Sequence, residues 1–385
     1  MHHHHHHGGS GPYHRLAPHR ALVCVCAAAE GQPAGRDGRF RRLDRNRDGK
    51  ITRDEVPPER QPLFERLDAD GDGAISSEEH RAFRENQQRR PPAGRPSPPE
   101  PDFANVAYGP HPRQVFDLWR PAANAAAGKP SPLLVFYHGG GFRGGDKSRI
   151  SLSLLRQLRE NGVAVAAANY RLTDTAPFPA PMHDAARALQ FIRLHADEYG
   201  IDPARVAATG GSAGAGISLW LAFHDDLADP AAEDPVARQS TRLAAALGTA
   251  AQTTYDPREH LRIFNSTELE DAMFAFYGME SVEQLAEPRF QALFEEASPI
   301  NHATPDDPPV MLAYSQPNTE LPPNPPGKLY IHHPKFGFLL KEKLDGIGLE
   351  CVLKLREDYP ENGQNQAVQD QVRFLCEKLG VALPE

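Results

Sequence analysis

The sequence GGSAG at residues 210–214 has the form GxSxG, with a serine between small residues. The apolar stretch VAAT before it predicts a strand, and the stretch GISLWLAFH after it predicts a helix. Small neighbours permit a sharp turn between strand and helix, which pushes the serine hydroxyl out of the sheet. The pattern therefore predicts Ser212 as a nucleophile.

A second glycine-rich motif, HGGGF at residues 138–142, follows an earlier predicted strand. Its spacing suits a loop of backbone donors beside a nucleophilic serine. The amides of Gly140 and Gly141, together with that of Ala213 at a helix N-terminus, could stabilise the oxyanion of a tetrahedral intermediate. The two motifs together predict acyl-transfer chemistry, whereas two glycine turns that only pack are the less favoured interpretation.

Two further segments form an internal repeat, LDRNRDGKITRDE and LDADGDGAISSEE. Each fits a twelve-residue calcium loop with oxygen ligands at positions one, three, five, seven and twelve and a glycine at six. The predicted Ca²⁺ ligands are Asp44, Asn46, Asp48, the Lys50 carbonyl and Glu55 in the first loop, and Asp68, Asp70, Asp72, the Ala74 carbonyl and Glu79 in the second. Ile51 and Ile75 occupy position eight, where paired loops exchange strand hydrogen bonds.

These groups need a scaffold, and strand-like and helix-like stretches alternate from residue 103 to the end. This alternation predicts an α/β protein with a mostly parallel sheet flanked by helices. The predicted strands are 115–121, 131–139, 163–172, 206–211, 243–250, 308–315 and 350–357, and the main predicted helices are 179–200, 213–224, 335–348 and 366–380. Cys351 and Cys376 fall on the last strand and helix, where buried free thiols are expected.

Composition limits the partners of the 385-residue chain, whose net charge is −9. Without a broad basic patch it offers little to nucleic acid, and no apolar run approaches the ~20 residues that span a bilayer.

Residues 1–11 carry a hexahistidine expression tag, and the stretch ALVCVCAAAEG after Arg20 resembles a short secretory leader, which predicts a secreted or periplasmic location. The domain boundaries follow as 1–35 for tag and leader, 36–85 for the calcium loops, 86–102 for a Pro- and Arg-rich linker, and 103–385 for the α/β domain.

Residues 103–385 resemble an α/β-hydrolase of the hormone-sensitive-lipase-like group, close to bacterial carboxylesterases and to feruloyl and acetylxylan esterases. The resemblance rests on HGGGF, NYRL, FPAPMHD, GIDPARV, GGSAGAG and ASPI, which occur in the order of that family. It implies ester hydrolysis by a Ser–His–acid triad without a metal in the chemistry. Residues 36–85 resemble a compact pair of EF-hands, an α-helical module whose calcium would be structural or would support protein docking.

The last two triad members depart from this resemblance. The family's acid follows the strand at 308–315, where this chain offers only Asn318 and Glu320. The family's histidine follows the last strand, but this chain has DYPENG there and no histidine beyond His333. The standard triad therefore cannot be assembled from these positions. The loss of a triad member costs a hydrolase several orders of magnitude in rate.

The adjacent His332 and His333 stand before Pro334, which suits the first turn of a helix. One interpretation is a helix cap and loop anchor. The other is a base supplied from this loop, with Asp358 or Glu357 after the last strand orienting the imidazole, so that base and acid have exchanged loops. His333 is slightly preferred as the base. A zinc site at this pair is disfavoured because no cysteine or carboxylate lies at metal spacing.

The remaining histidines are assigned structural places. His138 should order the oxyanion loop, His183 and His302 should make polar contacts, and His195, His224 and His260 should lie on helix surfaces. The resulting hypothesis is a serine carboxylesterase acting on small-molecule or carbohydrate esters, with a helical lid over residues 255–298. The alternative is a catalytically impaired hydrolase fold that binds a ligand or serves as a scaffold.

Overall fold

The computed structural model describes residues 50–52, 55–56, 64, 74–76, 78–82, 96–122 and 128–383. The tag, the predicted leader, most of the predicted linker, and the predicted calcium ligands Asp44, Asn46, Asp48, Asp68, Asp70 and Asp72 lie outside the described residues.

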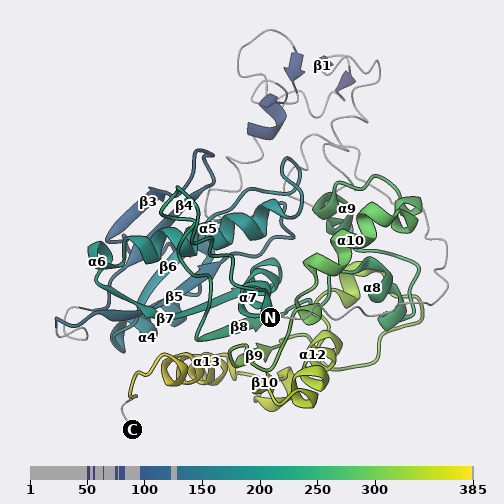
Figure 1. Ribbon diagram of the computed structural model, residues 1–385. Helices are drawn as coiled ribbons and strands as arrows, with labels where there is room; N and C mark the ends of the chain where they lie inside the picture. The colour runs from purple at the N-terminus through teal and green to yellow at the C-terminus, as the bar shows by residue number, and fades with distance from the viewer. Residues whose placement is uncertain are drawn as a thin grey trace.

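An eight-stranded sheet organises the main domain, with strand order β10-β9-β8-β7-β5-β6-β4-β3 (Figure 1). Its strands are β3 (Phe103–Ala107), β4 (Val115–Trp119), β5 (Ser131–Tyr137), β6 (Ala164–Ala168), β7 (Ile201–Gly211), β8 (Ala245–Thr249), β9 (Val310–Ala313) and β10 (Cys351–Lys354). The strands from β10 to β6 pair in parallel, whereas β4 pairs antiparallel with both β6 and β3. The predicted α/β-hydrolase fold is confirmed.

Helices cover both faces of this sheet, and successive side chains of β5 alternate between two cores. Leu133 and Val135 face one core and Leu134 faces the other, as a pleated strand buried on both sides requires. The first core includes side chains of α5 (Ala180–Leu194), α6 (Ala196–Tyr199), α7 (Ala213–Phe223) and α12 (Lys335–Gly346). The second includes side chains of α4 (Leu152–Glu160) and α13 (Gln364–Lys378).

The two cysteines expected to be free thiols belong to opposite cores. Cys351 packs in the first core and Cys376 in the second, and both are buried and unbonded. Burial in apolar surroundings raises the pKa of the Cys376 thiol to about 11 and that of Cys351 to about 12. Both thiols are therefore packing groups, as predicted.

Residues 255–298 are largely helical, as predicted, and form a group beside the sheet (Figure 1). The elements are α8 (Pro257–Phe264), α9 (Ala272–Tyr277), η5 (Val282–Ala286) and α10 (Pro288–Ala297), followed by η6 (Pro299–Asn301). Phe276 of α9 packs 4.6 Å, between ring centroids, from Phe142 of the HGGGF motif. This aromatic contact joins the helical group, called the cap below, to the glycine-rich loop.

The calcium-loop repeat contributes two short strands, β1 (Lys50–Thr52) and β2 (Ala74–Ser76). They pair antiparallel with Ile51 opposite Ile75, and both side chains are fully buried. The predicted pairing at position eight of the two loops is confirmed. Within the described part of the chain, no helix is both long and apolar enough to cross a membrane.

Candidate active site

Ser212 stands at the sharp turn between β7 and α7 with φ 51° and ψ −111°. A non-glycine residue rarely adopts this region, so the surroundings must enforce it. The turn packs closely against β5, which only glycine permits at two positions. A Cβ on Gly210 would lie 2.3 Å, and a Cβ on Gly214 1.9 Å, from the carbonyl oxygen of Tyr137. The Ser212 amide donates to the carbonyl of Thr249 on β8 at 2.8 Å. The strained nucleophile turn expected from GGSAG is present.

The HGGGF loop leaves β5, the neighbour of β7, and lies against the serine turn. A Cβ on Gly139 would be 2.8 Å from the carbonyl oxygen of Gly211 and 3.7 Å from Cβ of Ser212. Gly140 and Gly141 follow with φ of 120° and 64°, which favour glycine. The loop that carries Gly140 and Gly141 thus lies against the serine turn, which Ala213 follows directly, and the role of these three amides as oxyanion donors stays a prediction.

His138 fixes this loop through hydrogen bonds of its ring and of its backbone carbonyl. Its Nδ1 lies 2.7 Å from the Gly139 carbonyl oxygen, and its Nε2 lies 2.8 Å from Nη2 of the buried Arg113. Since guanidinium can only donate, Nε2 accepts and the imidazole is neutral. Burial, and then the charge of Arg113, lower the pKa of His138 to about 3. Tyr170 stacks on the ring at 4.3 Å and donates to the His138 carbonyl, and Arg113 also donates to the carbonyl of Gly145.

His332 is the imidazole that reaches the serine. Its Nε2 lies 3.0 Å from Oγ of Ser212, within the range expected for a nucleophile and its base. The residue lies in the loop between α11 (Gly327–Tyr330) and α12, and the preceding carbonyl, of Ile331, accepts a hydrogen bond from Gln252. Partial withdrawal of the ring from water lowers the pKa of His332 below 6.5.

His333, the slightly preferred candidate, is placed elsewhere, and the preference is corrected. Its Nε2 lies 2.8 Å from the carbonyl oxygen of Thr319, and its Nδ1 accepts from the amide of Lys335 at 3.0 Å. Both ring nitrogens are therefore engaged by backbone groups, one on the loop after β9 and one at the start of α12. The helix-cap and loop-anchor interpretation fits His333, and the base interpretation fits His332.

The predicted acids are not brought to this imidazole. Asp358 accepts from the amide of Leu355 at 2.7 Å, and Glu357 accepts from the amide of Asn318 at 3.1 Å. Glu320 is exposed on the loop after β9. Among the described residues, no carboxylate hydrogen-bonds to His332 or shifts its pKa. The expected orienting role of Asp358 or Glu357 is corrected, because both carboxylates accept from backbone amides, of Leu355 and Asn318, and neither bonds to His332.

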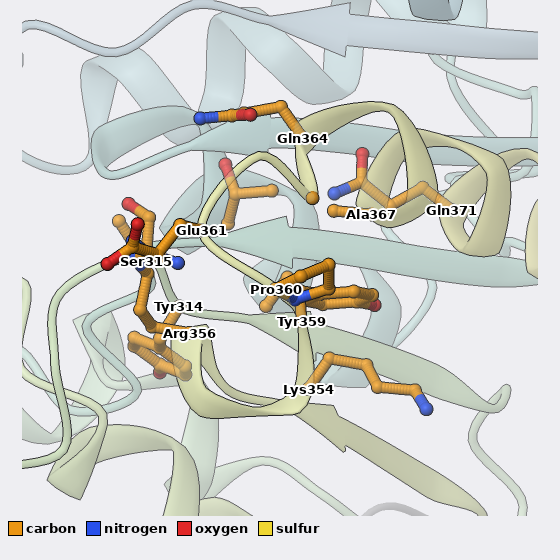
Figure 2. A pocket seen from close by; sticks show the side chains of 14 residues that line it. Tyr314, Ser315, Lys354, Arg356, Tyr359, Pro360, Glu361, Gln364, Ala367 and Gln371 are labelled. Carbon is orange, nitrogen blue, oxygen red and sulfur yellow. The ribbon is translucent and has the colours of Figure 1, made fainter.

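A pocket of about 240 Å³ opens at the carboxyl ends of β8, β9 and β10 (Figure 2), and neither Ser212 nor His332 lines it. Thr249, which accepts from the Ser212 amide, lines it together with Ser315 after β9. The loop after β10 contributes Tyr359 and Pro360, and Lys354 and Arg356 add positive charge. Hormone-sensitive-lipase-like hydrolases carry their catalytic histidine on the loop after the last strand. In this chain the same loop forms a wall of the pocket.

Two other histidine assignments need correction. His260, expected on a helix surface, is fully buried, with Nε2 2.7 Å from the carbonyl oxygen of Thr254. His224, also expected at a surface, is largely buried at the end of α7 and contacts Glu296. Sequence periodicity missed both because their burial comes from tertiary packing. The end of α7, which carries His224, packs against the cap, and α8, itself a cap helix, packs His260 against Tyr330 and Phe336.

Comparison with known proteins agrees with this fold. The sequence profile of the BD-FAE family matches residues 116–330, more than half of the chain. The chain belongs to the BD-FAE family. The EF hand profile matches residues 36–56 and 60–83 at the N-terminus.

Curated relatives of this BD-FAE member include mycobacterial esterases. It is 28% identical over 229 residues to the probable carboxylic ester hydrolase LipM of Mycobacterium tuberculosis, covering 57% of this chain and 50% of LipM. It is 27% identical over 220 residues to the esterase LipQ of the same organism, covering 57% and 49%. The chain thus spans about half the length of these relatives.

Solved structures share the fold at low sequence identity. A truncated carbohydrate esterase from gut microbiota aligns with a TM-score of 0.56 and 18% identity, over 74% of this chain and all of that one. An esterase from Thermogutta terrifontis aligns with a TM-score of 0.54 and 21% identity, over 75% and 96%. At such identities the likeness concerns the fold alone.

Proposed function

We propose that this BD-FAE member is a serine carboxylesterase in which Ser212 is the nucleophile and His332 the general base. The observation that supports it is the 3.0 Å separation of Ser212 Oγ and His332 Nε2 at a strained strand-to-helix turn. The curated relatives named as esterases support the reaction class. The substrate is a carboxylic ester, small or attached to a carbohydrate.

In the proposed reaction, His332 Nε2 takes the Ser212 proton as Oγ attacks the ester carbonyl carbon. The amides of Gly140, Gly141 and Ala213 stabilise the resulting oxyanion. His332 then gives the proton to the leaving alcohol as the tetrahedral intermediate collapses to an acyl-enzyme. Water attacks the acyl carbonyl with His332 again as base, which releases the acid and restores Ser212.

The imidazolium formed in this cycle has no carboxylate beside it among the described residues. Because His332 is exposed, water can solvate the positive charge in place of a buried acid. Two hydrogen bonds, one on either side, hold the loop that carries the ring. The Gln252 side chain donates to the carbonyl of Ile331, and the His333 ring bonds to the carbonyl of Thr319. A serine–histidine pair should therefore function with a lower rate than a full triad.

The test is the loss of turnover in a Ser212→Ala variant with a matched control, Ser218→Ala. Ser218 lies on the same helix, is buried, and donates only to the carbonyl of Gly214. Ser212→Ala should abolish hydrolysis of short p-nitrophenyl esters and covalent labelling by a fluorophosphonate, whereas Ser218→Ala should retain both. Equal rates in the wild type and Ser212→Ala would place the nucleophile elsewhere.

A second candidate function is a catalytically impaired hydrolase fold that binds an ester or carbohydrate ligand. The observation that favours it is the position of Asp358 and Glu357, which bond to backbone amides and not to His332. Absence of both ester turnover and fluorophosphonate labelling in the folded wild type would favour this function over the esterase.

We further propose that the N-terminal repeat binds two calcium ions as EF-hands. The two position-twelve glutamates behave alike, since Glu55 accepts from the Thr52 amide at 2.9 Å and Glu79 from the Ser76 amide at 3.2 Å. Such matched carboxylates, together with the carbonyls of the β1–β2 strands, suit a hard cation that prefers oxygen ligands. The calcium module would then be structural or would dock a partner. The leader-like segment before it supports an extracytoplasmic location.

A further inference from the structure

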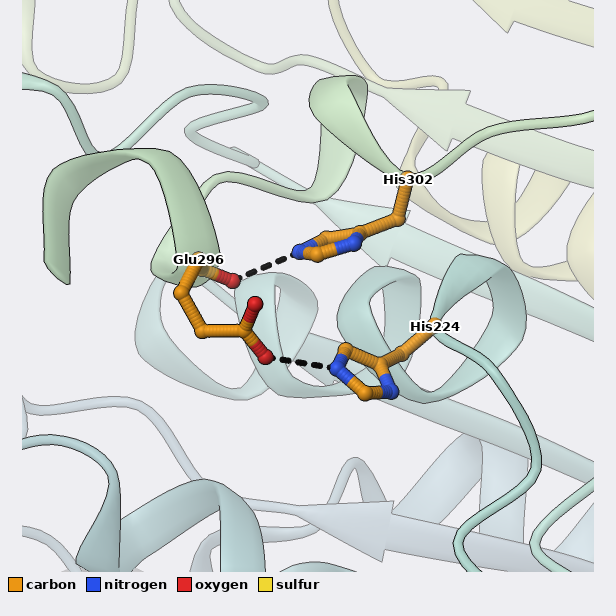
Figure 3. Close-up of side chains that lie close together, drawn as sticks. All are labelled: His224, Glu296 and His302. Atoms are coloured by element: carbon orange, nitrogen blue, oxygen red, sulfur yellow. Dashed lines mark hydrogen bonds and ion pairs between the residues drawn. The ribbon is translucent and has the colours of Figure 1, made fainter. Parts of the chain in front are cut away.

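Three residues meet where the cap helix α10 contacts the end of α7 that is opposite Ser212 (Figure 3). His224 follows α7, Glu296 belongs to α10, and His302 follows η6. Each offers one ligand atom, and these atoms lie within 4.8 Å of one another. Trp220 packs 4.2 Å, between ring centroids, from His224 and gives the group an apolar wall.

The hydrogen bonds of His224 define what its ring can bind. Nδ1 lies 3.0 Å from the carbonyl oxygen of Asp225, and because a carbonyl only accepts, Nδ1 must carry a proton. Nε2 lies 2.6 Å from Oε1 of Glu296. The Asp225 carbonyl thus faces Nδ1 and the Glu296 carboxylate faces Nε2, and both groups are acceptors. The contact between Nε2 and the carboxylate therefore requires a second proton, or a cation, between the two atoms. Histidines that bind metals commonly donate their other N–H to a carbonyl in this way.

His302 is fixed in a similar way. Its Nε2 lies 2.6 Å from the backbone carbonyl oxygen of Glu296, which also accepts from Nε1 of Trp220 at 3.0 Å. Nε2 of His302 therefore donates, and the neutral ring carries its lone pair on Nδ1. The two imidazole rings lie 4.7 Å apart between centroids.

We propose that His224, Glu296 and His302 form a binding site for a divalent transition-metal ion of the zinc type. Two imidazole nitrogens and one carboxylate oxygen are a donor set that zinc accepts, with a fourth position left for water. Tetrahedral ligands at zinc distances lie about 3.3 Å apart. Binding therefore requires the 2.6 Å contact between His224 and Glu296 to widen, and the more widely spaced ligand atoms, which lie within 4.8 Å of one another, to close in. The Glu296 side chain is 41% exposed and has room for this movement.

The site lies too far from Ser212 to take part in ester chemistry. The eleven residues of α7 separate His224 from the serine, a helix length of about 16 Å. The ion instead connects the end of the nucleophile helix to the last helix of the cap. Zinc should therefore stabilise the fold and leave the kcat/KM of ester hydrolysis unchanged.

The test is a calorimetric titration of Zn²⁺ into the full chain with His2–His7 removed, in millimolar Ca²⁺ to occupy the acidic loops. The expected result is one ion per chain with a Kd in the micromolar range or tighter, and a zinc-dependent rise in Tm. Glu296→Gln and His302→Ala should each weaken binding at least tenfold. The matched control is His195→Ala, because His195 pairs with Glu198 at 3.7 Å on the surface without a second histidine.

Circular dichroism of the metal-free variants checks their folding, and Glu296→Gln, which keeps the side-chain shape, decides the question if His302→Ala does not fold. Absence of zinc binding by the wild type would overturn the proposal and leave a His224–Glu296 ion pair. Equal binding by the wild type and Glu296→Gln would also overturn it.

Discussion

Nε2 of His332 lies 3.0 Å from Oγ of Ser212, although 120 positions separate the two residues. The imidazole comes from the segment between β9 and α12, whereas the loop after β10 contributes the wall of the neighbouring pocket. A catalytic pair is defined by contacts and roles and not by chain order, so a base delivered from this segment can serve the same reaction.

The first prediction concerns this pair. His332→Ala should lower kcat/KM on a short-chain ester by two or more orders of magnitude, because the serine loses its base. Since His332 is exposed, added imidazole should reach the vacated place and restore part of the rate. The same addition to Ser212→Ala should restore nothing. A His332→Ala rate close to that of the wild type would remove His332 from the mechanism.

The second prediction follows from the lowered pKa of His332. The base acts only as neutral imidazole, so kcat/KM should rise with pH and level off above the pKa. Partial desolvation places that midpoint below the ordinary value of 6.5. A pH profile on an ester of a non-ionising alcohol measures it. A midpoint above 6.5 would indicate a carboxylate partner that raises the pKa of His332 and would contradict the proposed serine–histidine pair.

The third prediction concerns the anchor of the oxyanion loop. Arg113 is fully buried and donates to His138 Nε2 and to the carbonyls of Tyr170 and Gly145. Arg113→Met should lower the free energy of unfolding by about 3 kcal/mol, because it leaves buried acceptors without a donor. It should also lower kcat, since the loop carrying Gly140 loses its support.

Urea denaturation measures this change, and Arg120→Met is the matched control. Arg120 is exposed, and its side chain donates one hydrogen bond, to the carbonyl of Glu198 at 3.1 Å, so the variant should change the free energy of unfolding by no more than about 1 kcal/mol. Equal midpoints for the two variants would show that Arg113 does not stabilise the loop.

The fold and the nucleophile could be predicted because their signals are local. Apolar runs bounded by turns mark the central strands, and GGSAG and HGGGF end two strands, β7 and β5, that are neighbours in the sheet. A parallel arrangement brings both ends to one edge, so spacing along the chain was sufficient to associate Ser212 with Gly140.

The remaining site depended on tertiary packing. His332 and His333 are adjacent and chemically identical, and only the loop backbone decides which ring faces Ser212 and which binds Thr319. His224 and His302 each meet Glu296 through the packing of the cap on α7, which no periodicity records. The short edge strand β3 was not predicted either, since its five residues do not alternate between apolar and polar and none of them is fully buried. The helix α4 was missed although Leu154, Leu155 and Leu158 recur at helical spacing, so its signal is present in the sequence.

The last prediction concerns the calcium loops. In the full chain, Ca²⁺ should bind with measurable heat and raise the Tm of the N-terminal module, because an ion that binds only the folded state adds RT ln(1 + [L]/Kd) to its stability. At a concentration of 100 times Kd, this amounts to about 2.7 kcal/mol. Glu55→Gln and Glu79→Gln should each weaken one loop by at least tenfold, because the bidentate ligand at position twelve loses its charge.

Glu78→Gln is the matched control, since Glu78 is the exposed neighbour of Glu79 and occupies no ligand position. It should leave both binding events unchanged. Ester turnover should change little in all three variants, because the proposed calcium ligands are separate from Ser212 and His332 in the sequence and in the chemistry. Absence of saturable binding at millimolar Ca²⁺ in the wild type would defeat the EF-hand proposal while leaving the esterase proposal intact.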